Sequence, residues 1–371
     1  MTSLTSHYLP PDLRYRVETQ ILAKCPPLVG RLIDAEEIDI DEQLQRAAVP
    51  VDQCIRNLTH RFPDGPTYFQ FVRAQAPTAM VQVFRDFQCL VFSEATYRQV
   101  TTALGALFEW TPLEAFVRFG VEPEDGNEAS LCSRREAVQA LLETAEPPSL
   151  GAQVWAVTIG NLILHFLAGH ELGHFALGHV RAGESGQSYL TEVDQARPDD
   201  RVASRAMEWE ADAFGAAATI WMTGSQRMDT EHPWSTLFPD NQSALRAFVI
   251  GAYILSSIMD LTDTTERPSD ERTHPAPMAR VTLMTSALAT TINQWGAIDG
   301  DTAIAEARAS IRAVEIALNM TGGGMMGADE ATALEAELRR SAPTLEAALP
   351  AVKSGQDRSR LQGYFWARIF D

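Results

Sequence analysis

One stretch limits what this chain can fold into: the apolar segment from Val154 to Gly178, which contains the pattern H-E-x-x-H. Few polar residues interrupt it, so it predicts a long buried helix. His170, Glu171 and His174 form the pattern. Residues four apart on a helix lie about 40° apart in rotation and roughly 6 Å apart along the axis, so both imidazoles can reach one ion. Glu171 then lies beside that ion, where it can accept a proton from a bound water.

A second predicted helix, from Ser204 as N-cap to Met222, offers a third ligand. Glu208 and Asp212 share one narrow stripe with the very small residues Ala211 and Gly215. Small residues let two helices approach closely, and acids that face a neighbouring helix need a partner. We therefore expect Glu208 to complete a Zn²⁺ site with the two histidines, and Asp212 to hold the second ring nitrogen of one of them. The alternative is an ordinary acidic helix face.

Two further histidines flank the pattern. His165 falls on the side of the helix opposite the two metal-binding histidines, so it is expected in the core. His179 follows Gly178, where the helix is expected to end, and is predicted to support the metal ligands or to have a structural role. On the second helix, Glu210 lies about 200° from Glu208 and is expected to face solvent or the rim of the site.

A third element is the segment R-T-H-P-A-P-M-A-R, residues 272–280. His274 precedes Pro275, so it is extended or in a turn. Pro277 can begin a helix that carries Arg280. A donor held there could act in catalysis by stabilising the oxyanion that forms when a carbonyl is attacked. The alternative is that His274 caps a helix and Arg280 forms a structural salt bridge.

The composition bounds the remaining possibilities. The chain has 371 residues, of which 45% are hydrophobic, so a packed core is feasible. A formal net charge of −19 argues against a nucleic-acid surface. The four cysteines form no C-x-x-C pair, which indicates a reducing compartment. The chain begins without an apolar signal core, and no apolar run reaches the roughly 18–20 residues of a membrane span. We therefore expect a cytoplasmic protein that acts on a protein or peptide substrate.

The expected fold is α+β: predominantly helical and zincin-like, with a small β-sheet beside the H-E-x-x-H helix. Residues 79–94 predict one or two strands with a turn near Arg85-Asp86, and an edge strand there would pair with an extended substrate. Residues 67–74 are assigned to a helix. The polar stretch 180–203 is a loop that borders the cleft or a solvated connector. Three regions follow: an N-terminal α+β region (1–150), the catalytic region (151–300) and C-terminal helices (301–371), expected to form one compact unit.

The segments HELGHFALGH, EWEAD and HPAPMAR together resemble the gluzincin metallopeptidases, which combine H-E-x-x-H with a Glu in an E-x-x-A-D helix. The last segment is similar to one in the membrane-protease branch that includes CaaX-processing and heat-shock-induced proteases. The histidine-rich stretch also resembles the soluble phage-exclusion peptidases of the Lit type. The resemblance covers residues 161–284, about a third of the chain. It implies zinc, with His170, His174 and Glu208 as ligands and Glu171 as the catalytic base.

The predicted function is a zinc-dependent endopeptidase that hydrolyses a peptide bond in a cytoplasmic protein by metal-activated water. One alternative is a metal-binding sensor or regulatory module, in phage defence or transcriptional regulation, with little or no turnover. Another is a metal-dependent hydrolase of a non-peptide amide. The intact Glu171 favours an enzyme, because a module without turnover has no need of the base.

Overall fold

The computed structural model describes residues 6–24, 31–59, 65–74, 77–124, 133–144, 146–177, 179, 198–262, 277–294, 297–320 and 336. The elements are α1 (Pro11–Lys24), α2 (Ala35–Ile40), α3 (Glu42–Thr59), β1 (Thr67–Val72), β2 (Ala79–Val83), β3 (Gln88–Ser93), α4 (Glu94–Trp110), α5 (Leu113–Phe119), α6 (Arg134–Leu142), α7 (Leu150–Ala176), α8 (Pro198–Met228), α9 (Trp234–Leu237), α10 (Asn241–Thr262), α11 (Pro277–Gln294) and α12 (Gly300–Met320).

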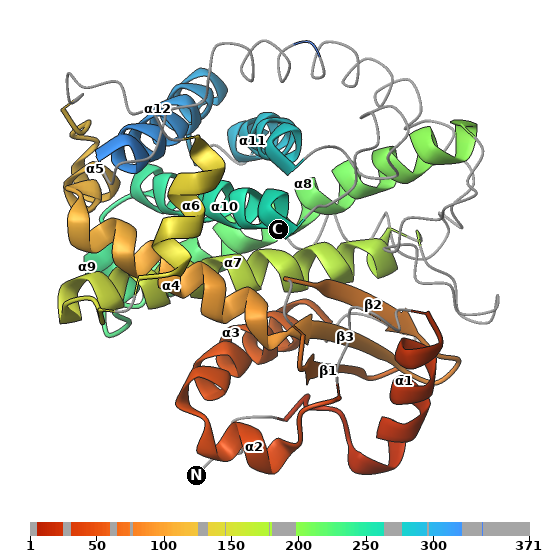
Figure 1. Ribbon diagram of the computed structural model, residues 1–371. Coiled ribbons are helices and arrows are strands. Elements are labelled where there is room, and N and C mark those ends of the chain that lie inside the picture. The colour runs from red at the N-terminus through yellow and green to blue at the C-terminus, as the bar shows by residue number, and fades with distance from the viewer. Residues whose placement is uncertain are drawn as a thin grey trace.

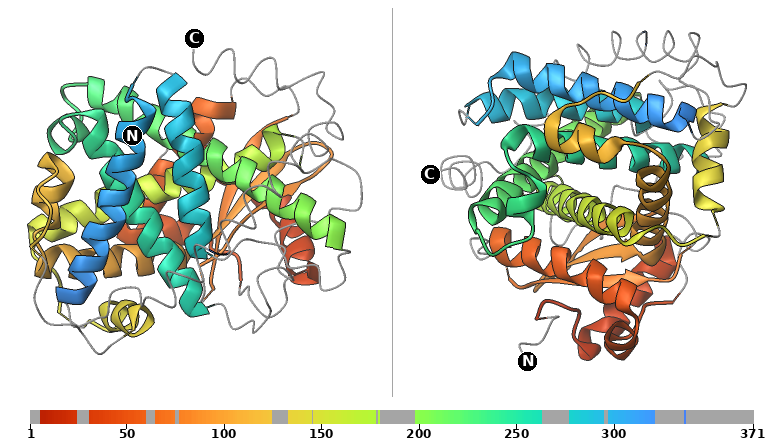
Figure 2. Two further views of the ribbon diagram at one scale, coloured as in Figure 1. Left: turned by 90° about the horizontal axis from the view of Figure 1, so that it is seen from above. Right: turned by 90° about the vertical axis from the view of Figure 1, so that its left-hand side faces the viewer.

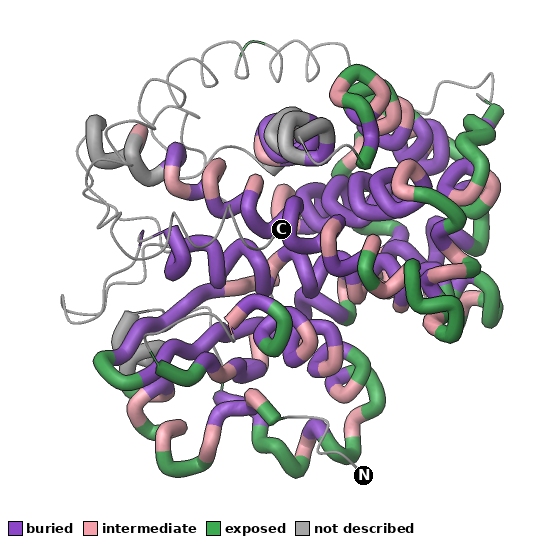
Figure 3. Tube along the Cα trace, turned by 180° about the vertical axis from the view of Figure 1, so that it is seen from behind, coloured by how far each residue is buried: buried purple, intermediate pink, exposed green. Residues whose placement is uncertain are grey.

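The long helix α7 crosses the middle of the molecule (Figure 1). The sheet and α1 to α3 lie on one side of it, and α10 to α12 lie on the other. Two further views show other elements around most of α7, in yellow-green (Figure 2), and none of its residues from Trp155 to Ala176 is exposed. Its apolar sequence is thereby explained, because a helix buried over this length has no face that must be polar. The tube coloured by burial shows the same central position (Figure 3).

The sheet has three strands in the order β1-β3-β2. β1 runs parallel to β3, whereas β2 runs antiparallel to it and forms an edge of the sheet. β2 and β3 are joined by a tight turn at Arg85-Asp86, closed by a 2.8 Å hydrogen bond from the N–H of Phe84 to the carbonyl of Phe87. The prediction of a small sheet at residues 79–94 within a mostly helical α+β fold is therefore confirmed.

The helix predicted at residues 67–74 is wrong, because β1 occupies Thr67–Val72. Phe69 and Phe71 point to one face of the sheet and pack against the cluster that contains α3 and α7. Tyr68 and Val72 pack on the opposite face. Aromatic and β-branched residues that alternate between two covered faces are typical of a buried strand.

Both faces of the sheet are buried, which is why its sequence alternates only in part. Phe71 and Phe92 belong to the hydrophobic cluster that contains Leu164 and Leu172 of α7. Val17 of α1 belongs to the cluster on the opposite face. Strands buried on both faces have near-continuous apolar sequences, and all six residues of β3 are buried. One core thus extends across the boundary at residue 150, although the division into three regions stays a prediction.

α8 is longer than the sequence predicted. It begins at Pro198, so Ser204 lies inside the helix and is not its N-cap. Proline is favoured at the first position of a helix, where its missing N–H would have no partner. The rest of the predicted polar loop, residues 180–197, lies outside the described residues.

Two helices, α7 and α10, are long and apolar enough to cross a membrane by length and composition alone. In their most apolar windows, 61% and 83% of the residues are buried inside the protein. Core helices of proteins in water pass the same test, so their presence is weak evidence for a membrane span. The expected lack of a span stays a prediction.

Candidate metal centre

Three buried side chains from α7 and α8 converge on one point. The Nε2 atoms of His170 and His174 are 3.1 Å apart. The two carboxylate oxygens of Glu208 lie 3.2 Å from Nε2 of His174 and 3.5 Å from Nε2 of His170. Zinc bound at about 2.0–2.1 Å with tetrahedral angles sets its ligand atoms roughly 3.3 Å apart. The group therefore fits a metal ion in spacing as well as in the chemistry of its donors.

The charges around this point also favour a cation. Glu171, Glu208 and Asp212 are at most 2% exposed, and Arg280 is the cation that contacts two of them. When the three carboxylates are ionised, one guanidinium does not compensate them, and uncompensated buried charge is costly. A proton on His170 or a bound metal ion would supply positive charge at this point.

The close packing of α7 on α8 brings the three candidate ligands together. A Cβ atom on Gly215 would lie 2.6 Å from the carbonyl oxygen of Phe166 and 2.7 Å from the backbone nitrogen of His170. A Cβ on Gly169 would in turn lie 3.0 Å from the Cα of Gly215. Only glycine allows backbones to come this close. The stripe of small residues on α8 lies against α7, as the sequence predicted, and Glu208 on that stripe faces the histidines.

Glu171 lies next to the group without belonging to it. Its Oε1 atom is 4.0 Å from Nε2 of His170, and its Oε2 atom has no hydrogen-bond partner among the described residues. Burial raises the pKa of Glu171 to about 8, against the opposing charge of His170. A hydrogen bond with the backbone of Val81 also acts to lower the pKa, with a smaller effect. Glu171 therefore stands between the histidines and the edge strand β2.

Asp212 lies against the outer side of His170. Its Oδ1 atom is 2.9 Å from Nδ1 of His170, within ion-pair distance although the ring N–H is not aligned with it. Burial acts to lower the pKa of His170, but Asp212 and Glu208 together raise it to about 10. Both carboxylates therefore favour positive charge at this position. Asp212 thus lies beside the ring of His170, and its predicted role of holding a metal ligand stays a prediction.

Arg280 of α11 donates two hydrogen bonds to Asp212, of 2.7 and 3.0 Å. Burial acts to raise the pKa of Asp212, but Arg280 and His170 hold it below its ordinary value. Arg280 thus holds a residue that contacts a ligand, as in the alternative interpretation of a salt-bridged arginine. The catalytic roles predicted for Arg280 and His274 stay predictions, and His274 lies outside the described residues.

His174 has a different partner on its outer side. Its Nδ1 atom is 3.0 Å from Nδ1 of His179, and Nε2 of His179 is 3.1 Å from Oε2 of Glu210. His179 thus lies beside a candidate ligand, and its predicted role of supporting the ligands or the structure stays a prediction. The contact of Glu210 with His179 was missed, because helical geometry relates residues of one helix and His179 lies beyond the end of α7. The signal in the sequence was that His179 follows His174 by only five residues.

His165 lies in the core, as expected. It is 1% exposed, its ring lies edge-on to Trp234, and neither ring nitrogen has a hydrogen-bond partner among the described residues. Burial, with a smaller effect of His232, lowers the pKa of His165 to about 3. It is too far round α7 to join the ligands.

Replacing His165 with leucine should make the protein less sensitive to acid. The pKa of a histidine in the unfolded chain is about 6.5, so below that pH the unfolded state binds a proton that native His165 does not. The native state then loses about 1.4 kcal/mol per pH unit. Urea denaturation measures the free energy of unfolding of both proteins at pH 7.5 and pH 5.0. The difference between His165→Leu and the native sequence should shift by about 2 kcal/mol in favour of the variant between the two pH values. An unchanged pH dependence would contradict the burial of an unpaired imidazole.

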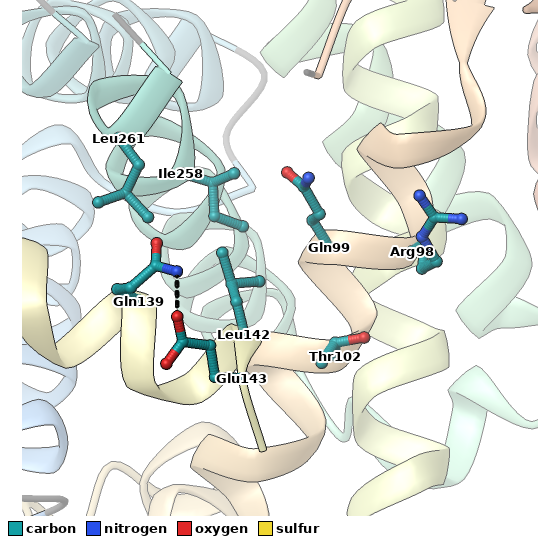
Figure 4. Close-up of a pocket in the computed structure, with 8 residues that line it drawn as sticks. All are labelled: Arg98, Gln99, Thr102, Gln139, Leu142, Glu143, Ile258 and Leu261. Carbon is teal, nitrogen blue, oxygen red and sulfur yellow. Dashed lines mark hydrogen bonds between the residues drawn. The ribbon is translucent and has the colours of Figure 1, made fainter. Parts of the chain in front are cut away.

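A surface pocket lies between α4, α6 and α10 (Figure 4). Arg98 and Gln99 of α4 line it on one side. On the other side lie Gln139 of α6 and Glu143, which directly follows α6, joined by a 2.6 Å hydrogen bond. Ile258 of α10 adds an apolar wall. None of the three candidate ligands lines this pocket, so it is separate from the metal centre.

No known protein family, curated protein or solved structure matched this chain when it was compared with them. Function therefore has to be inferred from the side chains themselves. The protein has a mostly helical α+β fold, and a buried group of two histidines and one glutamate in it could bind a metal ion.

Proposed function

We propose that this protein is a zinc-dependent endopeptidase. The observation that carries the proposal is the position of Glu171, a buried carboxylate beside three candidate ligands and with one oxygen unpaired among the described residues. A purely structural metal site has no use for such a group, because burying an unpaired carboxylate is unfavourable. A hydrolase needs one, since a base must take a proton from the attacking water.

Two imidazoles and a carboxylate are a ligand set typical of catalytic zinc, with three protein ligands and one open position. Zinc held by His170, His174 and Glu208 would lower the pKa of a water molecule and polarise a carbonyl oxygen. Glu171 takes the proton from the attacking water and later delivers it to the leaving nitrogen of the scissile bond. Asp212, held by Arg280, keeps the ring of His170 in place.

The edge strand β2 supports an extended peptide as the substrate. At one end of β2 the N–H of Phe84 donates to the carbonyl of Phe87, and at the other end the N–H of Ser93 donates to the carbonyl of Thr78. Hydrogen-bonded and non-hydrogen-bonded pairs alternate in an antiparallel ladder. The register therefore directs the backbone N–H and C=O groups of Ala79, Val81 and Val83 away from β3.

Among the described residues no strand pairs with this outer edge of β2. An extended segment could pair there through the backbone groups of Ala79 and Val83, which the bond between Glu171 and Val81 does not use, and gain main-chain hydrogen bonds, a recurring mode of peptide recognition. The contact between Glu171 and the backbone of Val81 places the side chain of Glu171 at this edge. A peptide on β2 would therefore pass directly in front of the proposed base.

We further propose that the substrate is a protein in a reducing, cytoplasmic compartment. The net charge of −19 disfavours nucleic acid as a partner. Cys54 and Cys89, the two cysteines among the described residues, are free and buried, which agrees with a reducing compartment.

Metal analysis of the purified protein tests the first step. We expect about one zinc per chain, because three protein ligands form one site. His170→Ala should retain less than about a tenth of that zinc. Mutating a residue that only contacts a metal ligand typically lowers metal affinity about 10- to 100-fold, and removing a ligand should lower it further. His232→Ala, a change outside the site, should keep it. A protein that neither contains zinc nor is stabilised by added zinc would rule out the proposal.

A further inference from the structure

The Nδ1 atoms of His170 and His174, on the side of each ring away from the proposed metal position, contact different groups. His170 contacts a carboxylate directly, at 2.9 Å from Asp212. His174 instead contacts a second imidazole, that of His179, which in turn contacts Glu210. The backbone N–H of His179 also donates a 2.8 Å hydrogen bond to the carbonyl of His174, which fixes the second ring beside the first.

The direction of these hydrogen bonds follows from the metal end. Nε2 of His174 points at the shared metal position, so a metal ligand must have a lone pair there. The proton of the neutral ring is then on Nδ1, which donates to Nδ1 of His179 across 3.0 Å. His179 accepts at Nδ1 and therefore carries its own proton on Nε2.

The same direction follows from the far end. Nε2 of His179 faces the Oε2 atom of Glu210 at 3.1 Å. An ionised carboxylate only accepts hydrogen bonds, so it selects the form of His179 with a proton on Nε2. With the proton on Nδ1 instead, His179 would donate to His174. The proton of His174 would then move to Nε2 and block the metal position.

We infer that His179 and Glu210 are positioning residues that hold His174 in its metal-binding tautomer. Glu210 sets the tautomer of His179, and His179 sets that of His174. The inference rests on the proposed function, because it requires a metal at the His170–His174–Glu208 group. The relay also suits its surroundings: the side chains of His179 and Glu210 are 1% and 13% exposed, so little water competes for these hydrogen bonds.

Zinc affinity, measured by competition with a chromogenic chelator, tests this inference. Glu210→Gln keeps the size of the side chain, but an amide can donate as well as accept and so no longer selects one tautomer. We expect it to bind zinc about 10-fold or more weakly. Glu231→Gln, an equal change of charge at an exposed position of the chain, should bind zinc like the native sequence.

A second pair of variants separates positioning from structure. His179→Gln retains an amide oxygen that can accept from Nδ1 of His174, whereas His179→Leu does not. The glutamine variant should therefore bind zinc more tightly than the leucine variant, at equal helix content by circular dichroism. Equal affinities would mean that His179 only fills space, and the inference would then be wrong.

Long-range ¹H–¹⁵N spectra of the zinc-loaded protein provide a readout that does not depend on activity. We expect a proton on Nδ1 of His174 and on Nε2 of His179, and a mixture of tautomers for His179 in Glu210→Gln. A proton on Nδ1 of His179 in the native sequence would overturn the inference. Zinc binding with this pattern but without peptidase activity would reject only the proposed enzyme. A failure of the native protein to bind zinc would reject both.

Discussion

Replacing Glu171 with glutamine is expected to abolish most peptidase activity and to leave zinc in place. Glutamine has nearly the same shape but cannot accept a proton, so the attacking water loses its base. General acid–base catalysis contributes about 10²- to 10⁴-fold to rate, and we expect a loss in that range. The zinc content should not fall, because Glu171 lies beside the ligands and is not one of them.

A comparison of protein N-termini in cells measures this loss and identifies the substrate at the same time. New N-termini are compared between cells that produce the native sequence and cells that produce Glu171→Gln. Cleavage products that appear with the native sequence and with Glu231→Gln, but not with Glu171→Gln, identify the substrate and the bond. Purified substrate then gives the rate of each variant.

Two outcomes would contradict the enzyme. Full biological activity of Glu171→Gln would mean that no proton transfer by this residue is needed. A native protein that binds zinc yet produces no new N-termini would favour the metal-binding sensor or regulatory module. The first result rejects the role of Glu171, and the second rejects turnover as such.

The convergence of α7 and α8 could be predicted, because it follows from the spacing of residues along each helix. His170 and His174 share a face of α7, and Glu208 shares a stripe of α8 with small residues. Helical periodicity gives each stripe separately, and small residues indicate that two stripes meet. The structure brings them to within 3.5 Å.

The remaining features depend on partners that local periodicity does not encode. β1 is a strand because other elements pack on both of its faces. Its short sequence does not show which elements these are. The contact between His179 and Glu210 joins residues 31 positions apart, one of them beyond a helix end. The expectation that Glu210 faces the rim came from α8 alone. Such contacts arise from the packing of α8 against the end of α7.

Gly215→Ala is expected to damage the metal site although Gly215 is not a ligand. The added Cβ would lie 2.6 Å from the carbonyl oxygen of Phe166 and 2.7 Å from the backbone nitrogen of His170. Backbone atoms of a packed helix cannot move aside as a side chain can, so α7 and α8 must separate. Overpacking of this kind costs about 1–3 kcal/mol, and we expect the upper part of that range. Glu208 moves away from the histidines with α8, so zinc affinity should fall by roughly 10-fold or more.

Gly224→Ala is the matched control, because Gly224 lies on the same helix and a Cβ there meets nothing within 4 Å. Alanine is favoured over glycine in a helix by about 0.5–1 kcal/mol, so this variant should be slightly more stable and should bind zinc normally. Urea denaturation and chelator competition on both variants give the comparison. If Gly215→Ala matched Gly224→Ala in both measurements, α7 and α8 could not approach as closely as described, and the spacing of His170, His174 and Glu208 would lose its basis.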